Sequence, residues 1–141
     1  MAYHAQADVE ALLKQLNFTF TTSSKITATD LATFLADTDR YIDNRLVNHY
    51  ITPVVDAVGV LILKPVAAQL TAAKCWRIIY AAQPGESNKA KEWERMSESV
   101  LAMIISKQMS LGNATRVSPS DSPWSAMADS EALWKMNKDQ W

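Results

Sequence analysis

The chain has 141 residues, of which 48% are hydrophobic and 21% charged, and its formal net charge is −1. This composition supports one domain with a substantial core and excludes global disorder. Near-neutrality argues against nucleic acid or an anionic membrane as the main partner, although a local basic patch remains compatible with it. Only three glycines favour helices over a turn-rich β fold. The single cysteine, Cys75, excludes an internal disulfide and is expected to be a buried thiol.

The first predicted helix spans residues 6–16, where apolar residues recur with the spacing of one buried face. Residues 18–24 follow as a loop that Phe18 and Phe20 attach to the core. A second helix is predicted over residues 28–48, with Thr27 as its N-cap and Asp30 completing a capping box. Its buried stripe is expected to comprise Leu31, Leu35, Ile42, Leu46 and His49.

Two like charges, Asp39 and Asp43, stand one turn apart on this second helix and repel each other. The simplest interpretation is a solvated acidic face. An external cation or a neighbouring subunit would also relieve the repulsion, so both residues are candidates for a subunit interface.

The second helix ends before Pro53, because the residue preceding a proline disfavours the α conformation. Residues 54–63 are rich in β-branched side chains and are predicted to be an extended apolar arm, with a helical continuation of residues 60–63 as the alternative. The arm is too short and too interrupted to span a membrane. An apolar arm with no sheet to join is a candidate for burial against another subunit. Its predicted interface residues are Val54, Val55, Val58, Val60 and Leu61.

A central helix is predicted over residues 65–82, because this run is apolar on opposite faces and must be enclosed by neighbours. Pro65 suits the first helical position, and Pro84-Gly85 ends the run. The last helix is predicted over residues 88–110, with Ser87 as its cap and Gly112 as its stop signal. The fold class is therefore all-α: a small bundle of about four helices over residues 1–112.

The character of the chain changes at residue 113. Residues 113–124 are polar, contain two prolines and lack periodicity, which is typical of a linker. Three of the five tryptophans lie among the last 18 residues. Tryptophan is strongly enriched among interface hot spots, so residues 113–141 are interpreted as an extended docking tail. The alternative is that it folds back onto its own domain. The predicted partner-binding residues are Trp124, Met127, Leu133, Trp134, Met136 and Trp141.

No catalytic or metal-binding pattern is evident. His4 and His49 lack the spacing of zinc ligands, and no glycine-rich phosphate loop occurs. Cys75 and His49 are the one conceivable nucleophile–base pair, but no residue is placed to orient them. The chain is therefore expected to be no enzyme and to need no cofactor or metal.

Three stretches resemble the small head–tail connector (adaptor) proteins of tailed bacteriophages. The stretches are Met1-Ala2-Tyr3 with Ala7-Asp8-Val9-Glu10-Ala11-Leu12, Leu35-Ala36-Asp37-Thr38-Asp39-Arg40-Tyr41-Ile42-Asp43-Asn44-Arg45-Leu46 with His49-Tyr50-Ile51-Thr52-Pro53-Val54, and Ala68-Gln69-Leu70-Thr71-Ala72-Ala73-Lys74-Cys75-Trp76-Arg77-Ile78-Ile79-Tyr80. The resemblance covers about residues 1–111. The chain departs from the family pattern in the length of its apolar stretch 54–63 and in its tryptophan-rich tail.

The resemblance implies a structural protein of the virion neck, made in the host cytoplasm and assembled as a ring, commonly of twelve copies, beneath the portal protein. Such a ring extends the DNA channel and docks a stopper or tail-terminator protein on its tail side. DNA passes through without specific binding, which the near-neutral charge allows because strong phosphate contacts would hold it. In this family the C-terminal segment often reaches along the portal, in agreement with the interpretation of the tail. The alternative function is that of a non-viral helical adaptor that binds a partner through its C-terminal motif.

Overall fold

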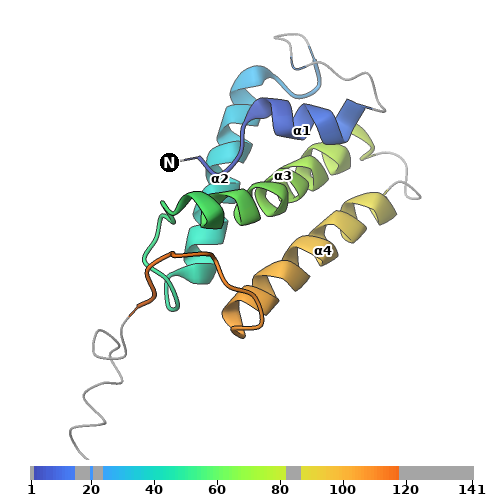
Figure 1. The fold of residues 1–141 in the computed structure, drawn as a ribbon. Coiled ribbons are helices and arrows are strands. Elements are labelled where there is room, and N and C mark those ends of the chain that lie inside the picture. Colours follow the sequence, from blue (N-terminus) through green and yellow to red (C-terminus); the bar gives the residue numbers. More distant parts are fainter. Residues whose placement is uncertain (1, 15–19, 21–23, 82–86, 118–141) are drawn as a thin grey trace, which may run out of the picture.

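The computed structural model is an all-α bundle of four helices (Figure 1). It describes residues 2–14, 20, 24–81 and 87–117. The helices are α1 (Gln6–Leu13), α2 (Ala28–Leu46), α3 (Ala57–Ile79) and α4 (Ser87–Ile105). No strand occurs among the described residues, where the one β contact is an isolated antiparallel bridge between Tyr50 and Arg116. The predicted fold class is confirmed for this part of the chain.

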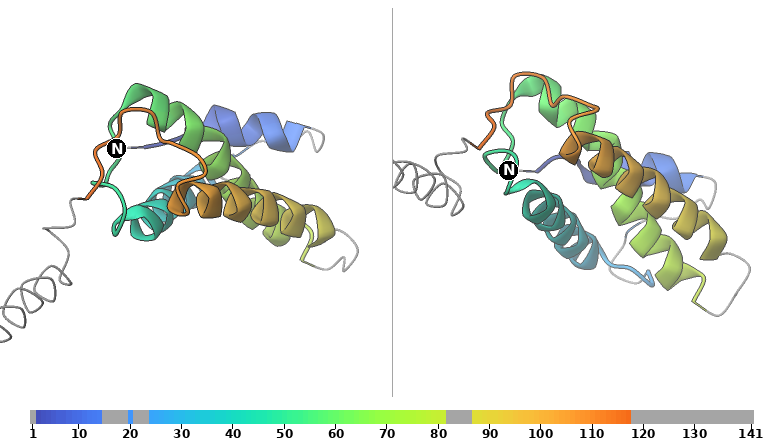
Figure 2. Two further views of the ribbon diagram at one scale, coloured as in Figure 1. Left: turned by 60° about the horizontal axis from the view of Figure 1, so that its bottom comes forward. Right: turned by 90° about the horizontal axis from the view of Figure 1, so that it is seen from below.

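Helix α3 lies at the centre and contacts each of the other three helices (Figures 1 and 2). The prediction of a central helix is therefore correct, but its start is not, because α3 begins at Ala57 rather than at Pro65. The predicted extended arm over residues 54–63 is accordingly wrong for its helical part. Asp56 provides the N-cap, since its carboxylate accepts a hydrogen bond of 3.0 Å from the Gly59 amide. Pro65 lies inside the helix, where its missing N–H leaves only the Leu61 carbonyl without its usual partner.

With its first two turns included, α3 is long and apolar enough to cross a bilayer. Half of its most apolar window is buried inside the bundle, and the core helix of a soluble protein meets the same criterion. Length and composition alone therefore do not assign α3 to a membrane.

Short polar contacts define the starts of α1 and α2. The Asp8 carboxylate accepts a hydrogen bond of 2.8 Å from the Ala5 amide at the start of α1. At α2 the predicted capping box is present: Thr27 Oγ1 accepts from the Asp30 amide, and Asp30 accepts from the Thr27 amide. Phe20 is buried, as predicted, whereas Phe18 lies outside the described residues.

Helix α4 ends earlier than predicted, at Ile105, and Lys107 adopts the left-handed conformation just beyond it. Gly112 is therefore not the stop signal of this helix. It occupies a later turn with φ +63°, and an added Cβ would lie 2.7 Å from the Cβ of Val58. A side chain at this position would collide with α3, so the turn needs glycine because of both its backbone angle and its packing.

Residues 113–117 do not leave the bundle as a free linker. They lie against the segment that joins α2 to α3 (Figure 2). The Ile51 amide donates to the Thr115 carbonyl at 2.8 Å, and the Val117 amide donates to the His49 carbonyl at 3.1 Å. The guanidinium of Arg116 lies over the ring of Tyr50. We call residues 113–117 the C-terminal strip.

The core has two clusters, one at each end of α3. The first, at the end where the C-terminal strip lies, joins α2, α3 and α4 around Leu63 and includes Tyr3, Ile42, Leu46, Tyr50, Val54, Leu101, Ile104 and Leu111. The second lies around Trp76 and includes Val9, Leu13, Phe20, Ile26, Leu31 and Cys75. In α2 the observed buried stripe is Leu31, Thr38, Asp39, Ile42 and Leu46, so two polar residues replace the expected Leu35 and His49.

Candidate functional site

Metal binding and nucleophilic attack by Cys75 are the first chemical possibilities to consider. No group of three or more His, Cys, Asp or Glu side chains is arranged there to hold a metal ion. Cys75 is fully buried, and this burial raises the pKa of its thiol to about 11. A thiol that stays protonated at neutral pH is a poor nucleophile. Cys75 belongs to the cluster around Trp76, whereas His49 follows α2 beside the C-terminal strip, so the structure does not bring this pair together.

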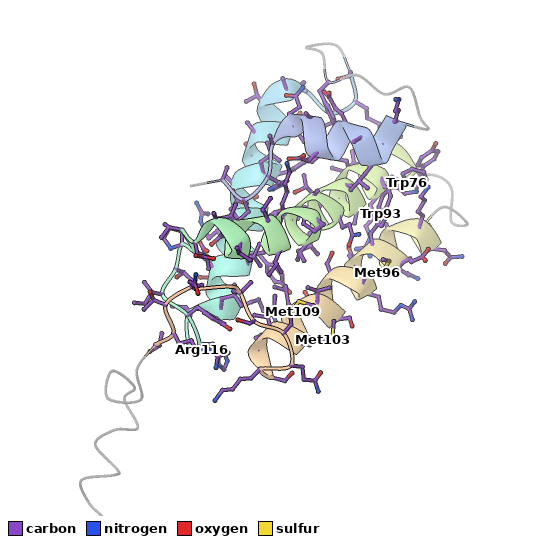
Figure 3. All side chains as sticks on the ribbon, viewed as in Figure 1. Trp76, Trp93, Met96, Met103, Met109 and Arg116 are labelled. Carbon is purple, nitrogen blue, oxygen red and sulfur yellow. The ribbon has the colours of Figure 1, made fainter. Side chains whose placement is uncertain are left out.

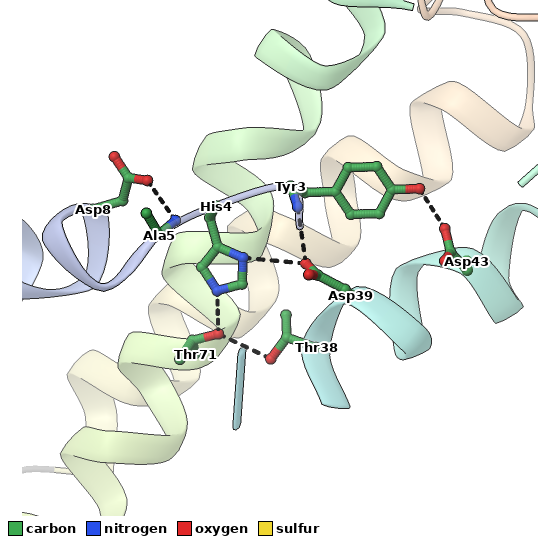
Figure 4. A network of polar contacts seen from close by, with 8 residues as sticks. All are labelled: Tyr3, His4, Ala5, Asp8, Thr38, Asp39, Asp43 and Thr71. Atoms are coloured by element: carbon green, nitrogen blue, oxygen red, sulfur yellow. Dashed lines mark hydrogen bonds and ion pairs between the residues drawn. The ribbon is translucent and has the colours of Figure 1, made fainter. Parts of the chain in front are cut away.

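A buried polar network attaches the N-terminal residues to α2 and α3 (Figure 4). His4 is the centre of it: Nδ1 lies 3.2 Å from Asp39 Oδ1, and Nε2 lies 2.8 Å from Thr71 Oγ1. Thr71 and Thr38 share a further hydrogen bond of 2.9 Å. Burial lowers the pKa of His4, and burial raises the pKa of the Asp39 carboxyl. In both residues burial disfavours the charged form of the side chain.

The neighbouring residue, Tyr3, makes a second attachment. Its hydroxyl donates to the Asp43 carboxylate and accepts a hydrogen bond of 2.9 Å from the Val54 amide. Burial and the Asp43 carboxylate raise the pKa of Tyr3 far above its usual value. Tyr3 and His4 therefore connect α2, α3 and the segment before α3. Sequence reasoning missed this network, because nothing local in residues 3 and 4 indicates partners 35 to 67 positions away.

The expectation of a solvated acidic face at Asp39 and Asp43 is wrong. Asp39 is 9% exposed and bonds to the backbone amide of Tyr3 as well as to His4. Asp43 is half-buried and accepts from the Tyr3 hydroxyl. The charge repulsion is relieved by the N-terminal residues of the same chain, so neither carboxylate needs a second subunit for this purpose.

The residues predicted to form a subunit interface divide into two groups. Val54 is 1% exposed and packs in the first core cluster, and Val60 is half-buried against that cluster, so neither is presented to a partner. Val55, Val58 and Leu61 are instead 71%, 50% and 67% exposed. Val47 and Ile51, which follow α2, are exposed at the same end of the bundle. We call Val47, Ile51, Val55, Val58 and Leu61 the apolar end.

The predicted partner-binding residues Trp124, Met127, Leu133, Trp134, Met136 and Trp141 lie outside the described residues. What the structure does give is the point from which this segment starts. Val117 is bound to His49, between α2 and Ile51 of the apolar end. The tryptophan-bearing segment therefore begins at the end of the bundle that also exposes most apolar side chains.

A groove between α3 and α4 is a further surface that sequence reasoning missed. It has a volume of about 590 Å³. Its apolar lining comes from both helices and from Met109 beyond α4, and Met96 and Met109 are labelled in Figure 3. Its polar lining is Gln69, Arg95 and Ser99. Met96, which lines the groove from α4, is 46% exposed.

The comparisons with known proteins identify no relative: no family model matches the chain, and no significant match was found among curated proteins or solved structures. The resemblance to phage head–tail adaptors therefore rests on the sequence motifs alone. The surfaces just described are the structural basis for any statement about function.

Proposed function

We propose that the chain is a non-enzymatic structural adaptor of a tailed phage, which assembles as a ring, expected to have twelve copies, between the portal protein and a stopper or tail-terminator protein. Its place is the neck of the virion, where the ring surrounds the DNA path without binding a specific sequence. The observation that carries the proposal is the apolar end, five exposed apolar side chains on a bundle that has two core clusters of its own.

The composition of the apolar end supports contact with another protein. Val55, Val58 and Leu61 are at least half exposed and belong to neither core cluster, whereas Val54 and Leu63 are members of the first. Isolated exposed apolar residues are common on monomers, but a group of five at one end of a small bundle is typical of an interface. The tryptophan-bearing segment starts beside Ile51, so a second set of candidate interface residues begins at this end.

Burial of the apolar end alone provides too little free energy for a stable assembly. Each side chain is already partly covered, so its full burial contributes about 1 kcal/mol. The sum over the group is roughly 5 kcal/mol, which is similar to the lower estimates of the entropic cost of association. We therefore expect weak self-association of the free chain and firm assembly only when further contacts, including those to the portal, are added.

The test is native mass spectrometry and analytical ultracentrifugation of the full chain, alone and with the portal protein encoded by the same genome. A ring that forms on the portal, and a double variant Val58→Ser/Leu61→Ser that fails to join it while keeping its helical circular dichroism, would support the proposal. Ala32→Ser/Ala36→Ser on the exposed face of α2 is the matched control. A chain that stays monomeric at all concentrations and ignores the portal would exclude it.

A further inference from the structure

We propose that the groove between α3 and α4 of one copy is the docking site for the tryptophan-bearing segment, residues 118–141, of a second copy. The inference says that the groove and the segment bind each other. It rests on the proposed function in one respect, the existence of contacts between copies. It is carried by the groove, by the point where the described chain ends, and by the chemistry of the residues that follow.

The groove has the size and lining of a site for large apolar side chains. Its volume of about 590 Å³ lies in the range of ordinary ligand pockets. Ile62, Pro65 and Val66 of α3 form one wall, and Met96 and Val100 of α4 form the other. Methionine adapts its shape to an incoming group, and its sulfur makes favourable contacts with aromatic rings. An indole ring is therefore a suitable occupant.

The charges of the two surfaces are complementary. Arg95 lines the groove, and Lys91 is exposed one turn before it on α4. Neither side chain forms an ion pair with any residue that the structure describes. Residues 118–134 contain Asp121, Asp129 and Glu131 but no Lys, Arg or His, so this part of the segment is acidic. Arg95 also provides a cation for the face of a docked indole.

The direction of the C-terminal strip favours a second copy over the chain's own groove. After Met109, at the groove, the chain passes Val58 at Gly112 and reaches His49 and Ile51 on the α2 side (Figure 1). The segment therefore starts after the chain has moved away from its own groove. Its 24 residues reach about 80 Å when extended, which is enough to cross to an adjacent copy.

This arrangement also suits a closed ring. The donor surface is the segment after Val117, and the acceptor surface is the groove between α3 and α4, so the two surfaces are different. A contact between two different surfaces of identical copies is heterologous, and heterologous contacts repeat around a ring. Each copy would give its segment to one neighbour and receive a segment from the other. This contact would add the binding free energy that the apolar end alone does not provide.

The first experiment isolates the groove. A labelled peptide of residues 118–141 is titrated against an acceptor variant, the full chain with Trp124→Ser, Trp134→Ser and Trp141→Ser. We expect binding that Arg95→Glu/Met96→Glu weakens at least tenfold, because the change reverses the charge and places a carboxylate on the apolar wall. Ala102→Glu, an exposed position of α4 outside the groove, is the control and should leave the affinity unchanged. No binding, or equal binding to the groove variant, overturns the proposal.

The second experiment decides which copy is the acceptor. A donor variant has the Arg95→Glu/Met96→Glu groove and an intact segment. When it is mixed with the acceptor variant, native mass spectrometry should show 1:1 heterodimers that neither protein forms with itself to the same extent. A wild-type chain in which cross-links join the segment to the groove within one monomer overturns the assignment to a second copy.

The outcomes separate this inference from the proposed function. If the chain forms a ring on the portal and the groove variant does so equally well, the inference fails while the proposed function stands. If the peptide occupies the groove and heterodimers form, but no ring or portal complex appears, the inference stands and the proposed function fails.

Discussion

His4 Nδ1 lies 3.2 Å from Asp39 Oδ1, and this buried pair joins the N-terminal residues to the middle of α2. The His4 side chain is wholly inaccessible and the Asp39 side chain is 12% exposed. No buried side-chain nitrogen or oxygen in the described part of the chain lacks a hydrogen-bond partner. Each side chain of this buried network provides a hydrogen-bond partner for another. Removal of one side chain should therefore lower the free energy of unfolding by more than the value of one hydrogen bond.

We expect His4→Ala to lower the free energy of unfolding by about 3 kcal/mol, since it removes the buried hydrogen-bond partner of Asp39 and Thr71 and leaves a cavity in its place. Asp39→Asn alone should cost less, because an amide carries no charge to bury. The measurement is urea unfolding followed by circular dichroism at pH 7, for both single variants and for the double variant. Coupling of about 1 kcal/mol or more is expected between the two positions. Strictly additive effects would show that the pair does not act as a unit.

The same pair predicts a pH dependence. Burial lowers the pKa of His4 below its usual 6.5, against the opposing effect of the Asp39 and Asp8 carboxylates. On acidification below pH 6.5 the unfolded chain takes up a proton before the folded chain does. Stability should therefore fall as the pH is lowered from 7, with a limiting slope of about 1.4 kcal/mol per pH unit.

Asp39 changes the stability in the opposite direction. Burial raises the pKa of its carboxyl above 3.8, so the folded chain holds this proton more tightly than the unfolded chain, and the resulting stabilisation is lost as the pH rises. Asp39→Asn removes this contribution and the attraction that keeps a proton on His4. In that variant the fall in stability should extend to lower pH than in the wild type. His4→Asn should remove the slope, and His49→Asn should retain it. A wild type that becomes more stable between pH 7 and 5 would mean that the ion pair outweighs burial.

The parts of this fold that could be predicted from sequence are those that depend on neighbours in the chain. Thr27 and Asp30 are three residues apart, and their capping box formed as predicted. The start of α3 was harder to predict, because its β-branched residues favour an extended arm. The Asp56 cap and the burial of Leu63 and Val66 favour the helix that the structure has. Val54 shows the limit, because an apolar residue in a loop gives no sign whether it meets its own core or a partner. The attachment by Tyr3 and His4 depends wholly on contacts distant in sequence, as does the groove.

Gly59 in the first turn of α3 gives a test of packing against helix propensity. Alanine should stabilise a helix relative to glycine by about 1 kcal/mol. Here its Cβ would lie 2.8 Å from Val54 Cγ1 and 3.0 Å from the Leu111 carbonyl oxygen, and the latter belongs to the backbone. We expect Gly59→Ala to destabilise the chain by about 1–2 kcal/mol despite the gain in propensity. The control is Val58→Ala, which changes an exposed side chain in the same turn.

Thermal unfolding of both variants measures the difference. Gly59→Ala should have the lower midpoint, and Val58→Ala should stay close to the wild type. A more stable Gly59→Ala variant would show that the strip after Leu111 moves readily away from α3. In that case the C-terminal strip would not set a fixed starting point for residues 118–141.

Thr27→Ala should lower the free energy of unfolding by about 1 kcal/mol, because it removes the side chain that accepts from the Asp30 amide. Thr29→Ala, two positions further and exposed in the first turn of α2, should leave stability nearly unchanged and is the matched control. Thr27 is half-buried and Thr29 exposed, and neither belongs to the core, so a large difference between the variants reports mainly the cap. Equal effects in chemical unfolding would mean that α2 is held by its packing on α3 alone. The start of α2 would then add nothing to the position of Asp39, which would depend entirely on its buried contacts with Tyr3 and His4.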